Sequence, residues 1–234
     1  MNILITGASR GIGAATFDLL RSTGHIVAGH STVGSGELIA ADFTDPAGSR
    51  TLWEAALERL DHIDVLVNNA GIYEGVSVDA QDEEWHAAWA RTLTVNLQAS
   101  ADLSRLAVAH FRERRSGGRI VNVSSRAGHR GDSPDHWHYA ASKAAILGMT
   151  KTIARGYAKD NILAFAVCPG FTMTSMVEDF MASRGISDAV VAEIPLGRVA
   201  KAEEVAETIR WLAIEAPAAS TGSVIDVNGA SYVR

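Results

Sequence analysis

Short apolar runs alternate with longer stretches of helical spacing along the chain, and this order limits the fold more than any other feature. The runs that predict strands are Ile3–Thr6, His25–Gly29, Leu38–Ala41, Ile63–Val67, Arg119–Val123, Ile162–Val167 and Ser223–Val227. Several are apolar at almost every position, as strands buried on both faces are. Strand, helix and strand in repetition give right-handed crossovers and a parallel sheet. We therefore expect an α/β fold, with a doubly wound parallel sheet of about seven strands and helices on both faces.

The stretch Arg50–Leu60 is an example of the helical spacing. Its apolar side chains share one stripe, formed by Leu52, Trp53, Ala56, Leu57 and Leu60. Asp45 can cap this helix and Pro46 suits its first turn. The sequence predicts an amphipathic helix here.

Composition and charge exclude several classes of protein. The chain holds 27 Asp and Glu against 21 Lys and Arg. Without a basic surplus for a phosphate backbone, we expect no nucleic-acid partner. No apolar stretch reaches the ~20 residues that span a bilayer, and no basic leader precedes the first strand, so we expect no membrane segment and no signal peptide. The single cysteine, Cys168, cannot form an internal disulfide. We therefore expect a cytoplasmic protein.

No low-complexity linker, repeat or change of composition divides the chain. A length of 234 residues suits one large domain, so we predict a single Rossmann-type domain over residues 1–234. One irregular region, Phe171–Val199, follows the structure-breaking pair Pro169-Gly170. We expect short helices or a lid over a site there, in residues 171–199.

A glycine-rich segment, Thr6–Gly13, follows the first predicted strand and opens a helix. Gly7 would permit a tight turn, Gly11 would let the backbone approach a pyrophosphate, and Gly13 would let the helix pack close to the sheet. The first N–H groups of that helix are free to bind phosphate oxygens. No Gly-Lys-Ser/Thr follows, so the segment is not a P-loop. Its place in a βαβ unit predicts a dinucleotide site.

Tyr139 and Lys143 are four residues apart in a stretch of helical spacing, so they face the same side. A free tyrosine has a pKa near ~10 and exchanges protons poorly at neutral pH. An adjacent ammonium would favour the phenolate and lower that pKa. Alone, the pair is more typical of an ordinary amphipathic helix, and its meaning depends on the motifs around it.

Further motifs stand at the ends of predicted strands: Asn68–Gly71 after the fourth, Asn122–Ser125 at the fifth and Pro169-Gly170 after the sixth. With the glycine segment and the Tyr–Lys pair, they make the chain resemble the short-chain dehydrogenases/reductases from Ile3 to Gly229. The nearest generic resemblance is to 3-oxoacyl-acyl-carrier-protein reductases. It implies an oxidoreductase that transfers a hydride between a nicotinamide cofactor and a ketone or secondary alcohol.

The resemblance assigns four residues to catalysis. Tyr139 would be the general acid/base, and Lys143 would lower its pKa and bind the nicotinamide ribose. Ser125 would hydrogen-bond the substrate carbonyl oxygen. Asn96 would hold a water that links the lysine to a proton relay. The chemistry agrees, because a serine hydroxyl and a phenol can stabilise the charge that develops on a ketone oxygen and supply the proton.

The resemblance also assigns cofactor contacts. Asp42 would touch the adenine, Asn69 and Gly71 would support that side of the pocket, and Thr172 and Thr174 would bind the carboxamide. Beside Tyr139 and Lys143, the residues implied are Gly7, Ser9, Arg10, Gly11, Ile12, Gly13, Ser31, Thr32, Asp42, Phe43, Asn69, Ala70, Gly71, Pro169, Gly170, Thr172 and Thr174.

The cofactor preference depends on the end of the second strand. A carboxylate there binds the ribose hydroxyls of NAD and repels the extra phosphate of NADP. Here the position falls at Ser31, beside Thr32, and the next carboxylate is Glu37. Arg10 can approach the same phosphate. These residues predict NADP(H), with NAD(H) as the alternative.

Two features of the sequence allow alternative interpretations of the site. The interval from Ser125 to Tyr139 is one residue longer than the family's commonest spacing, so Ser124 is an alternative partner for the substrate. Strand alternation puts the two serines on opposite faces, and only one can face it. Three histidines, at 129, 136 and 138, stand close together, but no nearby cysteine or H-E-x-x-H pattern accompanies them. We expect a polar loop and no metal.

The leading hypothesis is an NADP(H)-dependent reductase of a small-molecule ketone, with a 3-oxoacyl thioester as one candidate. The alternatives are an NAD(H)-dependent dehydrogenase of a sugar or another alcohol, and a non-catalytic NADP(H)-binding sensor. Such sensors usually lose the Tyr or the Lys, and both are present. The resemblance implies a homotetramer or homodimer. An apolar helix face could be core or interface, and it comprises Leu103, Leu106, Ala107 and Phe111.

Overall fold

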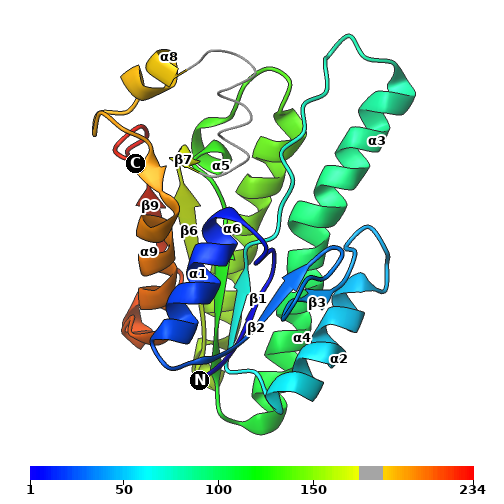
Figure 1. Cartoon of the computed structure of the whole chain (residues 1–234), viewed down its shortest axis with the longest axis vertical. Coiled ribbons are helices and arrows are strands. Elements are labelled where there is room, and N and C mark those ends of the chain that lie inside the picture. Colours follow the sequence, from blue (N-terminus) through cyan, green and yellow to red (C-terminus); the bar gives the residue numbers. More distant parts are fainter. Residues whose placement is uncertain (174–186) are drawn as a thin grey trace.

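Seven parallel strands form one sheet in the order β3-β2-β1-β4-β5-β6-β9 (Figure 1). The computed structural model describes residues 1–173 and 187–234, with side chains of the second segment from residue 190 onward. Every predicted strand is present, with ends that differ from the prediction by at most two residues. The bounds are β1 Asn2–Ile5, β2 Ile26–Ser31, β3 Ile39–Ala40, β4 Val65–Asn68, β5 Gly118–Val123, β6 Ile162–Pro169 and β9 Val224–Val227. The expected α/β doubly wound sheet is confirmed.

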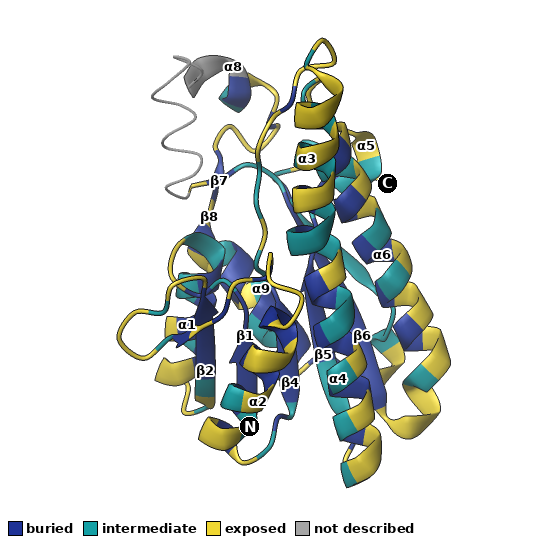
Figure 2. Ribbon diagram, turned by 90° about the vertical axis from the view of Figure 1, so that its right-hand side faces the viewer, coloured by how far each residue is buried: buried dark blue, intermediate teal, exposed yellow. Residues whose placement is uncertain are grey.

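Helices cover both faces of the sheet, because each strand carries apolar side chains on both sides (Figure 2). Helices α1 (Gly11–Ser22) and α9 (Ala202–Ile214) pack on one face. Helices α2 (Gly48–Leu60), α4 (Ala99–Arg114) and α6 (Trp137–Tyr157) pack on the other. The remaining elements are α3 Asp82–Leu93, η1 Thr94–Gln98, α5 Ala127–Arg130, η2 Ala158–Asp160, β7 Thr172–Met173, α8 Ser187–Ala192, β8 Ala200–Lys201 and η3 Ala218–Ser220.

The apolar face of α4 belongs to the core. Leu103, Ala107 and Phe111 are fully buried against the sheet, and Leu106 is half-buried against the same cluster. The alternative of an interface is therefore not needed to explain these side chains. Within the described residues, no helix combines the length and the apolar character that crossing a bilayer requires.

The predicted cap of α2 and the predicted lid in residues 171–199 have different outcomes. Asp45 does not cap α2: the N-cap is Ala47, and the Asp45 carboxylate accepts only the Ala47 N–H, at 2.8 Å. The extra turn 45–48 therefore separates Asp45 from the helix. Of the region 171–199, β7 and the short helix α8 are described. A lid there stays a prediction.

The strand order fixes where a ligand can bind. The chain builds outward from β1 to β2 and β3, then returns to β4 on the other side of β1. Helices on either side of this reversal lie on opposite faces, so a crevice opens at the carboxyl ends of the strands. The glycine segment and the motifs predicted at strand ends lie at the carboxyl ends of β1, β2, β4, β5 and β6, whereas the Tyr139–Lys143 pair lies in α6.

Candidate active site

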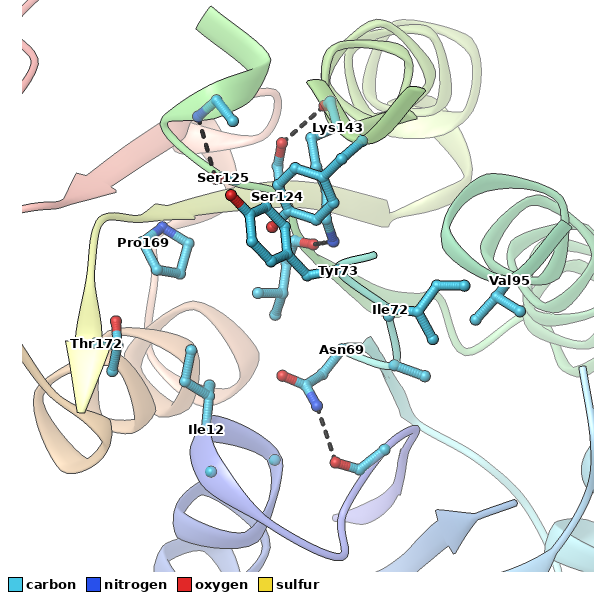
Figure 3. Close-up of a pocket in the computed structure, with 18 of the residues that line it drawn as sticks. Ile12, Asn69, Ile72, Tyr73, Val95, Ser124, Ser125, Lys143, Pro169 and Thr172 are labelled. Atoms are coloured by element: carbon cyan, nitrogen blue, oxygen red, sulfur yellow. Dashed lines mark hydrogen bonds between the residues drawn. The ribbon is translucent and has the colours of Figure 1, made fainter. Parts of the chain in front are cut away.

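A cavity of about 740 Å³ opens at the carboxyl ends of the strands, a size typical of cofactor and ligand sites. Residues from separate elements line it, among them Ile12, Asn69, Pro169 and Thr172 (Figure 3). The implied residues that line this one cavity are Gly7, Ser9, Arg10, Gly11, Ile12, Gly13, Ser31, Thr32, Asp42, Phe43, Asn69, Ala70, Gly71, Ser125, Tyr139, Lys143, Pro169, Gly170 and Thr172. Thr174 lies outside the described residues, and Asn96 is not part of the lining.

The glycine segment is held in place by the loop after β4. The Asn69 side chain donates to the carbonyl oxygens of Thr6 and Gly7, both at 3.0 Å. In return the Thr6 hydroxyl oxygen accepts the N–H groups of Asn69 and Ala70, both at 2.9 Å. A Cβ at Gly13 would stand 2.0 Å from the Gly7 carbonyl oxygen. Gly13 is therefore required by the approach of α1 to this loop, a closer reason than packing on the sheet.

His30 supports the same segment, and the sequence analysis missed it. Its Nδ1 accepts the Gly7 N–H at 3.1 Å, so its Nε2 carries the proton and donates to the Ala41 carbonyl oxygen at 2.8 Å. The ring stacks on Phe43. Burial lowers the pKa of His30, because a charged imidazole would lose its hydration there. A neutral histidine thus ties β2 to the loop after β1.

Ser125, at the end of β5, contacts Tyr139. The Ser125 side chain lies close enough to Tyr139 to favour its phenolate, and the Ser125 hydroxyl oxygen accepts the Ala127 N–H at 3.1 Å. Ser124 points the other way: it is buried and donates to the Lys143 carbonyl oxygen at 2.7 Å (Figure 3). Strand alternation separates the two serines as expected. The geometry favours Ser125 as the residue that faces a substrate, despite the longer interval before Tyr139.

Lys143 projects from α6 one turn after Tyr139, and its Nζ lies 5.7 Å from the Tyr139 ring centroid. The Nζ donates to the Val123 carbonyl oxygen at 3.0 Å. Burial without a carboxylate partner lowers the pKa of Lys143 to about 8. Burial also raises the pKa of Tyr139, and the nearby Ser125 side chain only partly offsets this. The expected lowering of the Tyr139 pKa is therefore wrong for this structure, because lost hydration outweighs the other effects.

Asn96 lies in η1, a single π-helical turn between α3 and α4. Such turns often occur at functional sites. Its amide oxygen accepts the Ile72 N–H at 2.8 Å, and its amide nitrogen donates to the Ile72 carbonyl oxygen at 3.0 Å. Asn96 thus fixes the chain just after Gly71, where an added Cβ would come within 3.4 Å of Lys143 Nζ. A water-holding role for Asn96 stays a prediction.

The end of the cavity near β2 carries cations and hydroxyls. Ser31 and Thr32 line it with Arg10, and Arg91 from α3 lines it too, a second arginine that the sequence analysis missed. The Asp42 carboxylate accepts the Thr44 N–H at 2.9 Å, which holds the pKa of Asp42 below its usual value. Glu37 is not part of this lining and pairs with Arg21.

The histidine cluster is divided by the fold. His136 and His138 are buried near Tyr73 and Trp89, whereas His129 lies beside Cys168. The His129 Nε2 is 3.5 Å from the Cys168 sulfur, and with Asp226 these ligand atoms all lie within 4.8 Å of one another. The sequence shows no cysteine near His129, because 39 residues separate it from Cys168. The fold brings the two together, so the expectation that no cysteine lies near was wrong. The expectation of no metal stays a prediction.

The buried Lys143 should make the stability of the free protein depend on pH. Between about 8, its folded pKa, and ~10.4, the unfolded chain still holds a proton that the folded chain has released, so rising pH favours folding. In thermal melts from pH 7 to 10, we expect Lys143→Met to lose this rise relative to the unmodified protein. Lys151→Met, an exposed site on the same helix, should keep it. Parallel curves for the protein and Lys143→Met would show that Lys143 titrates normally.

Comparison with known proteins agrees with this arrangement. A family model described as enoyl-(acyl carrier protein) reductase matches residues 7–230. The chain is 33% identical to the 3-oxoacyl-acyl-carrier-protein reductase FabG of Escherichia coli (strain K12), over 98% of this chain and 96% of that one. It is 36% identical to the FabG reductase of Thermotoga maritima, over 97% and 95%. It is 37% identical to nodulation protein G of Rhizobium sp. (strain N33), over 97% and 94%. The chain therefore belongs to the short-chain dehydrogenase/reductase family, and it is an oxidoreductase that acts on a CH–OH or C=O group.

Proposed function

We propose that the protein is an NADPH-dependent reductase of a ketone, for which a 3-oxoacyl thioester is the first substrate to test. The observation that carries this proposal is the placement of Ser125, Tyr139 and Lys143 in the wall of one cavity, with Lys143 one helical turn from Tyr139. The curated relatives include enzymes named 3-oxoacyl-acyl-carrier-protein reductases, at 32–36% identity. Their name supplies the substrate class.

The residues of the cavity fit a nicotinamide dinucleotide. The close contacts at Gly7 and Gly13 leave no room for a side chain, so the backbone borders the cavity at these two positions. Helix α1 begins in the same segment, with free N–H groups in its first turn. Ser9, Gly11 and Ile12 would hold the pyrophosphate, and Thr172 would hold the carboxamide. When bound, the cofactor supplies the hydride. Lys143 would bind the ribose. Because the buried ammonium has lost its hydration, hydrogen bonds to the ribose hydroxyls would stabilise it.

Ser125 and Tyr139 perform the proton chemistry. Both side chains line the same cavity, where the oxygen of a ketone would accept one hydrogen bond from each hydroxyl. Negative charge grows on that oxygen during reduction, so donors fixed in advance stabilise the transition state more than the ground state. Burial keeps the Tyr139 hydroxyl protonated, which suits a proton donor in the direction of reduction. Asn96 holds the loop at Ile72, and this loop places Gly71 beside Lys143.

NADPH is favoured over NADH by the charges near β2. No carboxylate stands at Ser31, and Glu37 is engaged with Arg21. Arg10 and Arg91 both line the cavity, so two guanidinium groups are available to a 2′-phosphate. Arg91 also lies 3.5 Å from the Glu74 carboxylate, which leaves Arg10 as the less constrained of the two. Assembly as a homotetramer or homodimer and a cytoplasmic location belong to the same proposal.

Tyr139→Phe should fold normally and bind NADPH but lose about 10²–10⁴-fold in kcat, because only the proton-transferring hydroxyl is removed. The assay follows NADPH oxidation with 3-oxobutanoyl-N-acetylcysteamine, and with the crotonyl thioester as a control that offers a C=C bond in place of the ketone. Cofactor binding is measured separately by fluorescence. Full kcat in Tyr139→Phe would remove the acid/base role. Reduction of the crotonyl thioester alone would replace the ketone by an enoyl substrate.

The two serines should differ in kinetics. Ser125→Ala should lower kcat by about 10²-fold or more, as the loss of one oxyanion-type donor does. Ser124→Ala removes a hydrogen bond to the Lys143 carbonyl, so we expect a smaller fall in kcat and a lower melting temperature. Steady-state kinetics and melts of both variants provide the comparison. A larger loss of kcat in Ser124→Ala would reverse the assignment.

Cofactor choice is tested with the unmodified enzyme and Ser31→Asp. We expect kcat/KM to favour NADPH over NADH at least tenfold, which requires contacts to the 2′-phosphate worth ~1.4 kcal/mol. A carboxylate at position 31 would repel that phosphate and bind the ribose hydroxyls of NADH, so Ser31→Asp should abolish or reverse the preference. Equal use of both cofactors by the unmodified enzyme would contradict the proposal.

A further inference from the structure

Arg126 stands at an unusual place in the cavity. It directly follows Ser125 at the carboxyl end of β5, and it lines the same cavity as Ser125 and Tyr139. Only 7% of the residue is exposed. Its backbone is fixed, because its N–H donates to the Pro169 carbonyl oxygen at 3.0 Å and its carbonyl oxygen accepts the N–H groups of residues 129 and 130. The side chain therefore starts from a rigid position beside the predicted carbonyl-binding hydroxyl.

The guanidinium of Arg126 has unmet hydrogen-bonding capacity. Its central carbon lies 4.4 Å from the centre of the Phe171 ring, which covers one face of the group. Its Nη1 atom is buried without a hydrogen-bond partner. Among the described residues, no carboxylate comes within ion-pair distance of it. Burial accordingly lowers the pKa of Arg126, although an arginine stays charged at any working pH.

The nearest charged groups are engaged elsewhere. The Glu193 carboxylate lies 3.9 Å from the Arg130 guanidinium. The Asp132 carboxylate accepts the Tyr73 hydroxyl at 3.3 Å and the Ser133 N–H at 2.8 Å. Arg130 itself adds a like charge, which makes the unpaired state of Arg126 more costly. A buried charge whose donors are unpaired is unfavourable, and such groups are normally paired or bound to a ligand.

The 2′-phosphate of NADP(H) does not account for the unpaired guanidinium of Arg126. In the sheet order, β2 and β5 are separated by β1 and β4, so their ends lie three strand spacings, or about 14 Å, apart. The 2′-phosphate is expected near Ser31 at the end of β2. Arg126 lies instead with Ser125 and Phe171, on the side where the ketone would be reduced. An anion bound there belongs to the substrate.

We propose that Arg126 binds a carboxylate of the substrate, so that the ketone reduced by this enzyme is an oxo carboxylic acid. A planar guanidinium with free N–H groups matches the two oxygens of a carboxylate, and Phe171 keeps its plane fixed. Burial strengthens the interaction, because little water competes for the charge. The proposal rests on the reductase function inferred above, and it favours a ketone that carries a carboxylate over the neutral 3-oxoacyl thioester as the substrate.

The test compares each acid with its neutral methyl ester: pyruvate, acetoacetate and levulinate, in which the carboxylate is one, two and three carbons from the ketone. With NADPH, we expect kcat/KM for the best acid to exceed that of its ester at least tenfold. Arg126→Met should lower kcat/KM for that acid by about 10- to 100-fold and leave the ester within about threefold. Arg130→Met is the matched control, because Arg130 lines the same cavity but is exposed and pairs with Glu193.

Three results would overturn the proposal: esters reduced as well as acids by the unmodified enzyme, equal losses on acid and ester in Arg126→Met, or the same selective loss in Arg130→Met. If Arg126→Met does not fold, Arg126→Lys keeps the charge without the fork and should still lose about tenfold on acids alone. Calorimetric binding of the acids, in the presence of NADP⁺, separates the two proposals. Acid binding that disappears in the variant supports Arg126 even without turnover, whereas absent turnover with every ketone contradicts only the reductase function. Equal acid binding by both proteins contradicts Arg126.

Discussion

The site depends on a junction between β1 and β4, where the strand order reverses. Four hydrogen bonds of 2.9–3.0 Å join Thr6 and the Gly7 carbonyl oxygen to Asn69 and the Ala70 N–H. This junction fixes the glycine segment against the loop that leads to Gly71. From there the Asn96 amide binds both backbone groups of Ile72. The two halves of the sheet are therefore connected by directional bonds at the one place where a ligand must contact both.

Dehydration sets the electrostatics of the other end. Within the described part of the chain, the buried Lys143 ammonium donates to one carbonyl oxygen, and the buried Tyr139 side chain lies near Ser125. Burial disfavours the charged form of each group, so it favours the neutral amine of Lys143 and the neutral phenol of Tyr139. New hydrogen bonds from ligand oxygens would therefore stabilise the Lys143 ammonium, and the Tyr139 hydroxyl stays protonated. Both properties follow from where α6 packs against β5 and β6, and neither needs a further charged residue.

The sequence predicted what depends on local pattern. Apolar runs placed every strand of the sheet to within two residues, because buried parallel strands must be apolar on both faces. The motifs at strand ends placed the glycine segment, Ser125 and Tyr139 in one cavity, since carboxyl ends of parallel strands share an edge. The direction of the Tyr139 pKa shift was wrong, because a helical spacing of four says nothing about burial.

Other parts of the site depend on contacts between distant segments. His30 and Arg91 carry no motif, and their roles follow from which loop passes beside them. Cys168 of β6 approaches His129 of α5 only in the folded chain, because 39 residues separate them in the sequence. Arg126 could have been noticed, since it follows an implied catalytic residue, but an arginine after a strand is usually solvated. Only its 7% exposure and its unpaired nitrogen distinguish it from a surface side chain.

The sheet also keeps the two selective regions apart. Ser31 lies at the end of β2, where the proposed cofactor preference is set, whereas Ser125 and Arg126 lie at the end of β5, with the proposed substrate contacts. Side chains more than 7–10 Å apart without shared partners usually contribute independently to free energy. The three strand spacings between β2 and β5, about 14 Å, exceed that limit. A doubly wound sheet therefore lets cofactor preference and substrate preference change separately, while the Thr6–Asn69 junction between them stays the same.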